Sequence, residues 1–157
     1  MLSSILAETE ASLLREIYSQ RRLVFTNGCF DLIHVGHVRY LTSAKQLGEI
    51  LVVGLNSDAS VRRLKGEGRP LNSESDRSEV LAALKPVDHV VIFNEMRVDR
   101  LVTELRPDIY VKGGDYSIDT LDRSEVAALS AAGAEIKILP LVPGRSTTQL
   151  IEAMQKR

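Results

Sequence analysis

The sequence predicts an α/β protein built around a parallel sheet. Short apolar runs rich in β-branched residues alternate with longer amphipathic segments along the chain, which is the pattern of repeated β-α-β units. The run at residues 50–55 is apolar throughout, as strands buried on both faces of a sheet are. The length of 157 residues, without a linker or repeat, fits one domain over residues 1–157. We therefore expect a Rossmann-like three-layer sandwich with a five-stranded parallel sheet in the order 3-2-1-4-5 and right-handed crossovers.

Five apolar runs supply the expected strands. Each run is followed by glycine or polar residues that would end a strand. Because helical segments separate them, each strand is expected to lie parallel to its neighbours. In chain order the expected strands span residues 23–26, 50–55, 89–93, 109–112 and 136–139.

Apolar residues at helical spacing predict helices before, between and after these strands. Residues 1–20, with Leu6, Leu13 and Ile17 on one face, are expected to form an N-terminal helix that packs on the domain. Gly48 and Gly133 stand where a glycine commonly ends a helix. The remaining expected helices span residues 36–47, 58–64, 73–84, 98–105, 121–132 and 147–155.

Composition and charge exclude several classes of protein. The chain has 20 Lys and Arg against 21 Asp and Glu, a net charge of −1 and 4% aromatic residues, so neither a basic nucleic-acid surface nor a base-stacking platform is expected. No apolar run is long enough to cross a membrane, and Glu8 and Glu10 interrupt the N-terminal segment where a signal peptide would stay apolar. The lone cysteine, Cys29, excludes an internal disulfide. We expect a cytoplasmic protein with no nucleic-acid or membrane partner.

Polar and glycine residues follow four of the five expected strands. They occupy residues 26–37, 56–58, 112–115 and 143–148. The carboxyl ends of parallel strands meet at one edge of a sheet, and ligands of open α/β sheets bind at that edge. The sequence therefore predicts a binding site built from these four segments.

His34 and His37 dominate the candidate residues, because two of the three histidines lie in one His-x-Gly-His tetrapeptide where a strand meets a helix. Gly36 between them lets the backbone approach a ligand, and the start of a helix directs unpaired N–H groups at a phosphate. Two imidazoles add neutral or cationic donors for phosphoryl oxygens. A zinc site is the alternative, although only carboxylates could complete it. His89, at the start of an apolar strand, is interpreted as structural.

Further candidates supply glycines, hydroxyls and cations. Residues 145–148 open the last helix with Arg-Ser-Thr-Thr, whose hydroxyls and N–H groups suit a phosphate or merely cap the helix. Residues 112–115, Lys-Gly-Gly-Asp, let a flat ligand lie against backbone. The basic, glycine-containing segment 62–69 could close over an anion as a lid. No phosphate-loop motif and no G-x-G-x-x-G fingerprint is present, which argues against a P-loop NTPase and a standard Rossmann dehydrogenase.

Residues 28–31 and 34–37, with residues 145–148 near the end, resemble the cytidylyltransferase-type nucleotidyltransferase superfamily. Residues 56–58 and above all 111–116 (Val-Lys-Gly-Gly-Asp-Tyr) are similar to the adenylyltransferase domain of bacterial ADP-heptose synthesis. This resemblance implies transfer of AMP from ATP to a sugar 1-phosphate, most simply D-glycero-D-manno-heptose 1-phosphate, with release of pyrophosphate, for lipopolysaccharide synthesis.

The resemblance also implies roles for individual residues. His34, His37 and Lys45 would be catalytic, and Mg²⁺ would bridge the triphosphate without a protein residue being assigned to hold it. The expected nucleotide-binding residues are Gly28, Cys29, Phe30, Gly36, Lys112, Gly113, Gly114, Asp115, Arg145, Ser146, Thr147 and Thr148. The expected residues for the sugar phosphate are Asp31, Asn56, Lys65 and Arg69.

In many members of the resembled family this domain is fused to a sugar kinase, and the chain departs from those fused enzymes in two ways that leave alternatives open. No sugar-kinase sequence is present, so a separate kinase is expected to supply the sugar phosphate, and a homo-oligomer, a dimer or larger, is expected. Residues 117–125 differ from the fused enzymes, which leaves the sugar open. The alternatives are a CTP-dependent enzyme acting on glycerol 3-phosphate or a similar alcohol phosphate, and a non-catalytic nucleotide-binding domain.

Overall fold

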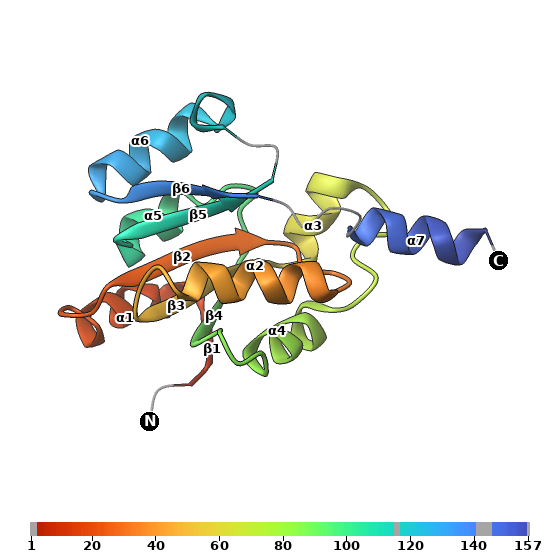
Figure 1. Ribbon diagram of the computed structural model, residues 1–157, viewed down its shortest axis with the longest axis horizontal. Helices are drawn as coiled ribbons and strands as arrows, with labels where there is room; N and C mark the ends of the chain where they lie inside the picture. The colour runs from red at the N-terminus through yellow and green to blue at the C-terminus, as the bar shows by residue number, and fades with distance from the viewer. Residues whose placement is uncertain (1–2, 115–116, 141–145, 157) are drawn as a thin grey trace.

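A parallel sheet of six strands in the order β1-β4-β3-β2-β5-β6 forms the centre of the protein. This computed structural model describes residues 3–114, 117–140 and 146–156. Helices cover both faces of the sheet, as Figure 1 shows. In chain order the elements are β1 (Ile5–Ala7), η1 (Glu8–Glu10), α1 (Ala11–Ile17), β2 (Leu23–Gly28), α2 (Val35–Lys45), β3 (Ile50–Asn56), α3 (Asp58–Lys65), α4 (Glu74–Ala82), β4 (His89–Phe93), α5 (Asp99–Leu105), β5 (Ile109–Gly113), η2 (Ile118–Thr120), α6 (Arg123–Ala131), β6 (Glu135–Leu139) and α7 (Thr147–Gln155).

The predicted count of five strands and the helix predicted over residues 1–20 were wrong at the N-terminus. Residues 5–7 form β1, which pairs with β4 at the edge of the sheet, and the helix begins only at Ala11. Leu6 lies opposite Val91 and is 2% exposed. A strand of three residues is too short to show a two-residue period, so its apolar residues merged with those of the helix that follows. The other five strands have the predicted order.

Alternating residues of the strands pack against two separate sets of helices. Phe25 and Tyr110 face a core with Leu14 of α1, Leu101 of α5 and Leu129 of α6. On the opposite face, β-strand residues pack against α2 and α4 in a second core. Residues of β2 and β3 are buried on both faces, which confirms the three-layer arrangement that the apolar run at residues 50–55 predicts.

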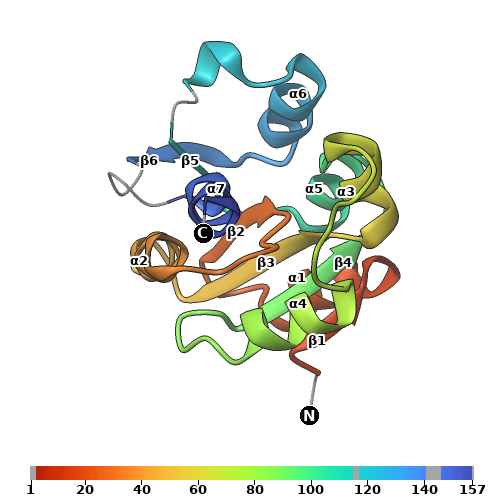
Figure 2. The ribbon, with the colours of Figure 1, turned by 90° about the vertical axis from the view of Figure 1, so that its right-hand side faces the viewer.

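The carboxyl ends of the strands carry α3 and α7, and Figure 2 views the molecule from that side. Figures 1 and 2 together show α7 extending away from the body of the protein beyond the strand ends. Gly133 has a φ of 74° and follows Ala132, the C-cap of α6, in agreement with its predicted role at the end of that helix. No helix among the described residues is long and apolar enough to span a membrane.

Candidate active site

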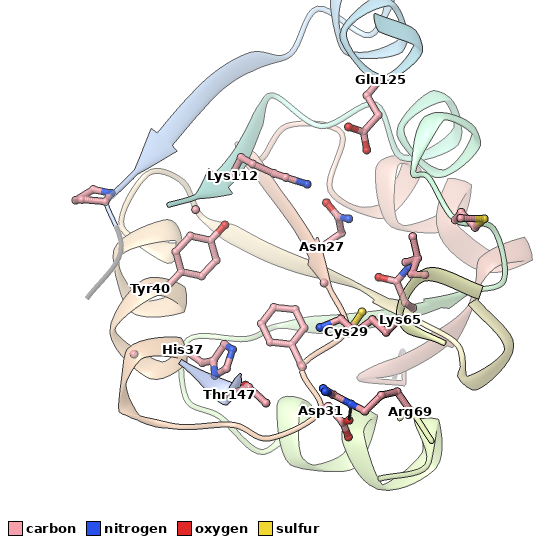
Figure 3. A pocket seen from close by; sticks show the side chains of 18 residues that line it. Asn27, Cys29, Asp31, His37, Tyr40, Lys65, Arg69, Lys112, Glu125 and Thr147 are labelled. Atoms are coloured by element: carbon pink, nitrogen blue, oxygen red, sulfur yellow. Dashed lines mark hydrogen bonds and ion pairs between the residues drawn. The ribbon is translucent and has the colours of Figure 1, made fainter. Parts of the chain in front are cut away.

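A cavity of about 450 Å³ opens at the carboxyl ends of β2, β3 and β5, where the sequence predicts the binding site. Figure 3 shows side chains from strands, helices and loops pointing into it. The lining residues are Asn27, Gly28, Cys29, Phe30, Asp31, Gly36, His37, Tyr40, Asn56, Leu64, Lys65, Arg69, Met96, Lys112, Gly113, Glu125, Pro140 and Thr147.

The cavity brings together most of the predicted site residues, although they come from segments far apart in the chain. Among the predicted residues that the structure describes, His34, Lys45, Gly114, Ser146 and Thr148 do not line it. The predicted ligands Asp115 and Arg145 lie outside the described residues. All the other predicted residues line the cavity.

The two histidines are held by the start of α2. His34 is the N-cap, and its Nδ1 accepts the Gly36 N–H at 3.0 Å. In turn, the His34 N–H donates to Nδ1 of His37 at 3.2 Å. The two rings lie with their centroids 4.1 Å apart. Because each Nδ1 accepts a backbone hydrogen bond, the neutral form of each ring carries its proton on Nε2, as a donor.

Burial keeps His37 neutral at physiological pH. Desolvation, followed by repulsion from His34 and Lys65, lowers the pKa of His37 to about 4. The sequence left open whether the imidazoles are neutral or cationic. The structure favours a neutral donor at His37 that keeps its proton arrangement throughout the range in which enzymes usually work.

The depressed pKa of His37 predicts a loss of stability in acid. Between pH 6.5 and about 4 the unfolded state binds a proton at His37 that the folded state does not bind, so the free energy of unfolding falls as the pH falls through this window. Since the ring is partly exposed, solvent screening should limit the effect to about 1–2 kcal/mol. Urea titrations of the wild type and His37→Asn at pH 7 and pH 4.5 measure it. The variant is expected to lose less stability than the wild type; an equal loss in both proteins would contradict the shift.

Asp31 fastens the loop that carries Arg69. Its Oδ2 accepts from Arg69 Nε at 3.0 Å and from the Leu71 N–H at 2.8 Å, and its Oδ1 accepts from the Asn72 N–H at 2.9 Å. Burial alone would raise the pKa of Asp31, but these two backbone bonds and Arg69 outweigh it and lower the pKa. Both carboxylate oxygens of Asp31 thus have protein partners, and its contact with the sugar phosphate stays a prediction. The structure also aims Arg69 at the cavity.

Arg77, which the sequence analysis missed, joins three of the segments that form the cavity. Its guanidinium donates to the carbonyl oxygens of Cys29 at 2.7 Å, Asn56 at 2.8 Å and Asn72 at 3.0 Å. It also pairs with the Asp58 carboxylate at 2.8 Å. The side chain is 1% exposed and is not one of the residues that line the cavity.

The described part of α7 contributes one residue to the cavity. Thr147 lines it and donates its hydroxyl to the Leu32 carbonyl at 2.9 Å. Ser146 caps the helix by accepting the Gln149 N–H at 3.0 Å, while Thr148 is exposed. The cap is therefore present, and Thr147 is the member of the predicted hydroxyl group that reaches the cavity.

Comparison with known proteins identifies this arrangement. The family model described as "Cytidylyltransferase-like" matches residues 25–153, which span the cavity and both histidines.

The chain belongs to the cytidylyltransferase-like family.

Curated relatives carry the name "Bifunctional protein HldE". That of Citrifermentans bemidjiense is 53% identical over 141 residues, 90% of this chain and 28% of the relative. That of Syntrophotalea carbinolica is 53% identical over 137 residues, 87% of this chain and 28% of the relative. The chain thus spans less than a third of the length of these relatives.

Solved structures share the cytidylyltransferase-like fold. A lipopolysaccharide core biosynthesis protein from Thermoplasma volcanium is 32% identical with a TM-score of 0.63, and the match covers 78% of this chain and 97% of that one. A pantoate-beta-alanine ligase from Francisella tularensis has a TM-score of 0.62 over 98% of this chain and 77% of that one, at 14% identity. The second likeness concerns the fold alone.

Lys45, which the resemblance implies to be catalytic, does not line the cavity and lies instead near the amino ends of the strands. It is the last residue of α2, about 15 Å along the helix axis from the N-terminus that holds the histidines. Its Nζ bonds the Asp88 carboxylate and the Glu49 carbonyl. These two residues directly precede β4 and β3, so Lys45 joins the amino ends of the strands.

Tyr40, Asn27 and Glu125 are cavity residues for which the sequence analysis proposed no role. Tyr40 follows His37 by three residues and therefore lies on the same face of α2, a spacing that could have identified it. The Tyr40 ring lies 3.0 Å from where a Cβ on Gly113 would stand. Close packing against Tyr40 is therefore one reason for a glycine at position 113. Glu125 lies in the first turn of α6, far along the chain, and no local signal marks it.

Proposed function

We propose that this cytidylyltransferase-like protein transfers AMP from ATP to D-glycero-D-manno-heptose 1-phosphate, forming ADP-heptose and pyrophosphate. The observation that carries the proposal is the pair His34 and His37 at the N-terminus of α2, beside a cavity that presents Lys65 and Arg69. Two imidazoles and a helix N-terminus suit a phosphoryl centre, and the surrounding cations suit the two anionic substrates. The relatives named HldE and the lipopolysaccharide core biosynthesis protein support this choice of chemistry.

In the proposed mechanism an oxygen of the sugar phosphate attacks the α-phosphorus of ATP and the bond to pyrophosphate breaks. The nucleophile is already an anion, so no strong base is required, and the protein has to align two anions that repel each other. At about 4 Å two unit charges interact by about 4 kcal/mol at an effective dielectric constant of 20, so nearby cations matter. His37 Nε2–H would donate to the charge that develops on the phosphoryl oxygens.

A metal ion held by the protein does not fit the donor set. Asp31 is engaged by Arg69 and two backbone N–H groups, and Glu125 faces Lys112. Among residues 3–114, 117–140 and 146–156 there is no group of three or more His, Cys, Asp or Glu placed to bind a metal. We expect Mg²⁺ to enter as the counter-ion of the nucleotide phosphates, which is a common mode for this ion.

A pyrophosphate-release screen tests the proposal. The protein is incubated with ATP or CTP and with heptose 1-phosphate, another sugar 1-phosphate or glycerol 3-phosphate. We expect release with ATP and heptose 1-phosphate. Release with CTP and glycerol 3-phosphate instead would make the chain a cytidylyltransferase, and nucleotide binding without release from any pair would make it a non-catalytic domain.

Arg69 is proposed to bind the sugar phosphate. Asp31 holds its Nε and leaves the guanidinium directed at the cavity. Replacing Arg69 with alanine is expected to raise KM for the sugar phosphate by about tenfold or more, the usual loss on removing a hydrogen bond to a charged group. Steady-state kinetics with each substrate varied in turn measure it. A rise confined to KM for ATP would assign Arg69 to the nucleotide.

The cellular setting is proposed from the same comparisons. The matched relatives are named bifunctional, and this chain spans 28% of the first two of them, so we propose that another polypeptide or segment supplies the sugar phosphate. The cytoplasm is the proposed location. The homo-oligomer expected from the resemblance stays a prediction, which the molecular mass measured by light scattering tests.

A further inference from the structure

Three polar side chains converge at the end of the cavity that is remote from the histidines. Lys112 of β5, Asn27 of β2 and Glu125 of α6 all line the cavity. Figure 3 shows Lys112 and Glu125 entering this end from facing elements, with Asn27 beside them. The mechanism above uses neither Asn27 nor Glu125.

Glu125 is a carboxylate buried at the cavity wall. It is 7% exposed, and desolvation is the main influence on its pKa, which is raised. Lys112 attracts the carboxylate and a backbone hydrogen bond from Val98 steadies it, whereas Asp99 and Asp122 repel it. A buried acid costs stability unless it has partners, and its place on a cavity wall leaves room for a ligand as a further partner.

Asn27 presents donors beside this carboxylate. Its Oδ1 accepts the Tyr110 hydroxyl at 2.6 Å, which fixes the orientation of the amide. The amide N–H groups are then the part of Asn27 that can meet a ligand. Together with the Lys112 ammonium, this end of the cavity offers donors and one acceptor within a small region.

Such a set complements a ligand edge that carries both a donor and an acceptor. A phosphate has only acceptors and would be repelled by Glu125, so the anions belong at the other end, with Lys65 and Arg69. Within a nucleotide, two parts fit: the vicinal ribose hydroxyls, and the adenine amino group with its neighbouring ring nitrogen. Both offer a donor to the carboxylate and an acceptor to the amide or ammonium.

We propose that Glu125, with Lys112 and Asn27, binds the polar edge of the nucleoside half of the nucleotide. This inference rests on the proposed nucleotidyl transfer. It adds a residue from α6, a helix that contributes no predicted ligand, to the recognition of the first substrate.

Equilibrium binding of nucleotides tests the proposal without turnover. Isothermal titration calorimetry compares ATP, 2′-deoxyATP, 3′-deoxyATP and purine riboside triphosphate, which lacks the 6-amino group, on the wild type and on Glu125→Gln. We expect the wild type to bind ATP about tenfold more tightly than the analogue that lacks the group facing Glu125. This preference should fall to about twofold or less in Glu125→Gln, and the analogue that shows the change distinguishes ribose from adenine.

The controls separate this inference from the proposed function. Glu16→Gln, at an exposed position on α1, should keep the wild-type preference among nucleotides. Wild-type discrimination that persists unchanged in Glu125→Gln would overturn the proposal, as would a rise in KM for the sugar phosphate with unaltered ATP affinity. If Glu125→Gln does not fold, equal wild-type affinity for all four nucleotides would overturn it. Failure of the proposed function would give a different result: the wild type would still prefer ATP over the analogues in calorimetry, but no substrate pair would release pyrophosphate.

Discussion

Replacing His37 with alanine is expected to lower kcat by about 10²–10³-fold while the protein remains folded. The expected loss is that of one preorganised donor to a transition-state charge. The neutral ring presents Nε2–H to the cavity because its Nδ1 accepts the His34 N–H and burial keeps its pKa at about 4. Pyrophosphate release under saturating substrates measures kcat, and circular dichroism with thermal unfolding checks the fold.

Two further variants show whether the loss comes from the donor. His37→Asn retains an acceptor near the position of Nδ1, so it should keep the contact with the His34 N–H and still lose kcat. His89→Gln changes a histidine that bonds Tyr18 and the Ser3 carbonyl near the N-terminus, and it should cost stability without lowering kcat. A folded His37→Ala protein with unchanged kcat would remove this histidine from the mechanism.

Replacing Arg77 with methionine is expected to destabilise the protein by about 3–5 kcal/mol, because each of three carbonyl oxygens that loses its donor costs about 1–3 kcal/mol. Methionine fills much of the space but leaves one buried and two partly buried carbonyl oxygens, and Asp58, without the guanidinium. Because Asp58 is partly exposed, most of the loss should come from the unsatisfied carbonyls. Urea denaturation measures the free energy of unfolding.

Two control substitutions define the role of Arg77. Arg39→Met, at an exposed position on α2, should change stability by less than about 0.5 kcal/mol. Arg77→Lys keeps the charge but loses the planar fork, so it should be less stable than the wild type and more stable than Arg77→Met. Equal stability of Arg77→Met and the wild type would show that the three segments are held by other contacts.

The sequence predicted most of the fold because the parallel strands are marked by apolar residues. Each inner strand contains a run of at least three apolar residues, and the gaps between these runs have helical periodicity. The strand β1 was not predicted, because a strand of three residues shows no recognisable period. The same reading predicted a binding site at the carboxyl ends of the strands, which is where the cavity lies.

Individual site residues were harder to predict than the edge itself. Lys45 follows the histidines on the same helix, but a helix advances about 1.5 Å per residue, which carries Lys45 away from the cavity to the amino ends of the strands. Asp31 was predicted to bind the substrate, and in the structure both of its carboxylate oxygens accept hydrogen bonds from the loop from Arg69 to Asn72. Such partners lie far along the chain, and no local pattern reveals them.

By itself, the sequence determined the layered α/β architecture and the pair of histidines at the start of α2, because each depends on periodicity or on neighbours within a few residues. Only the tertiary structure decided that Arg77 fastens the loops from within, that His37 is neutral and that Glu125 faces the cavity. These properties depend on burial and on contacts between segments distant in the chain, which arise only when the sheet and its helices pack together.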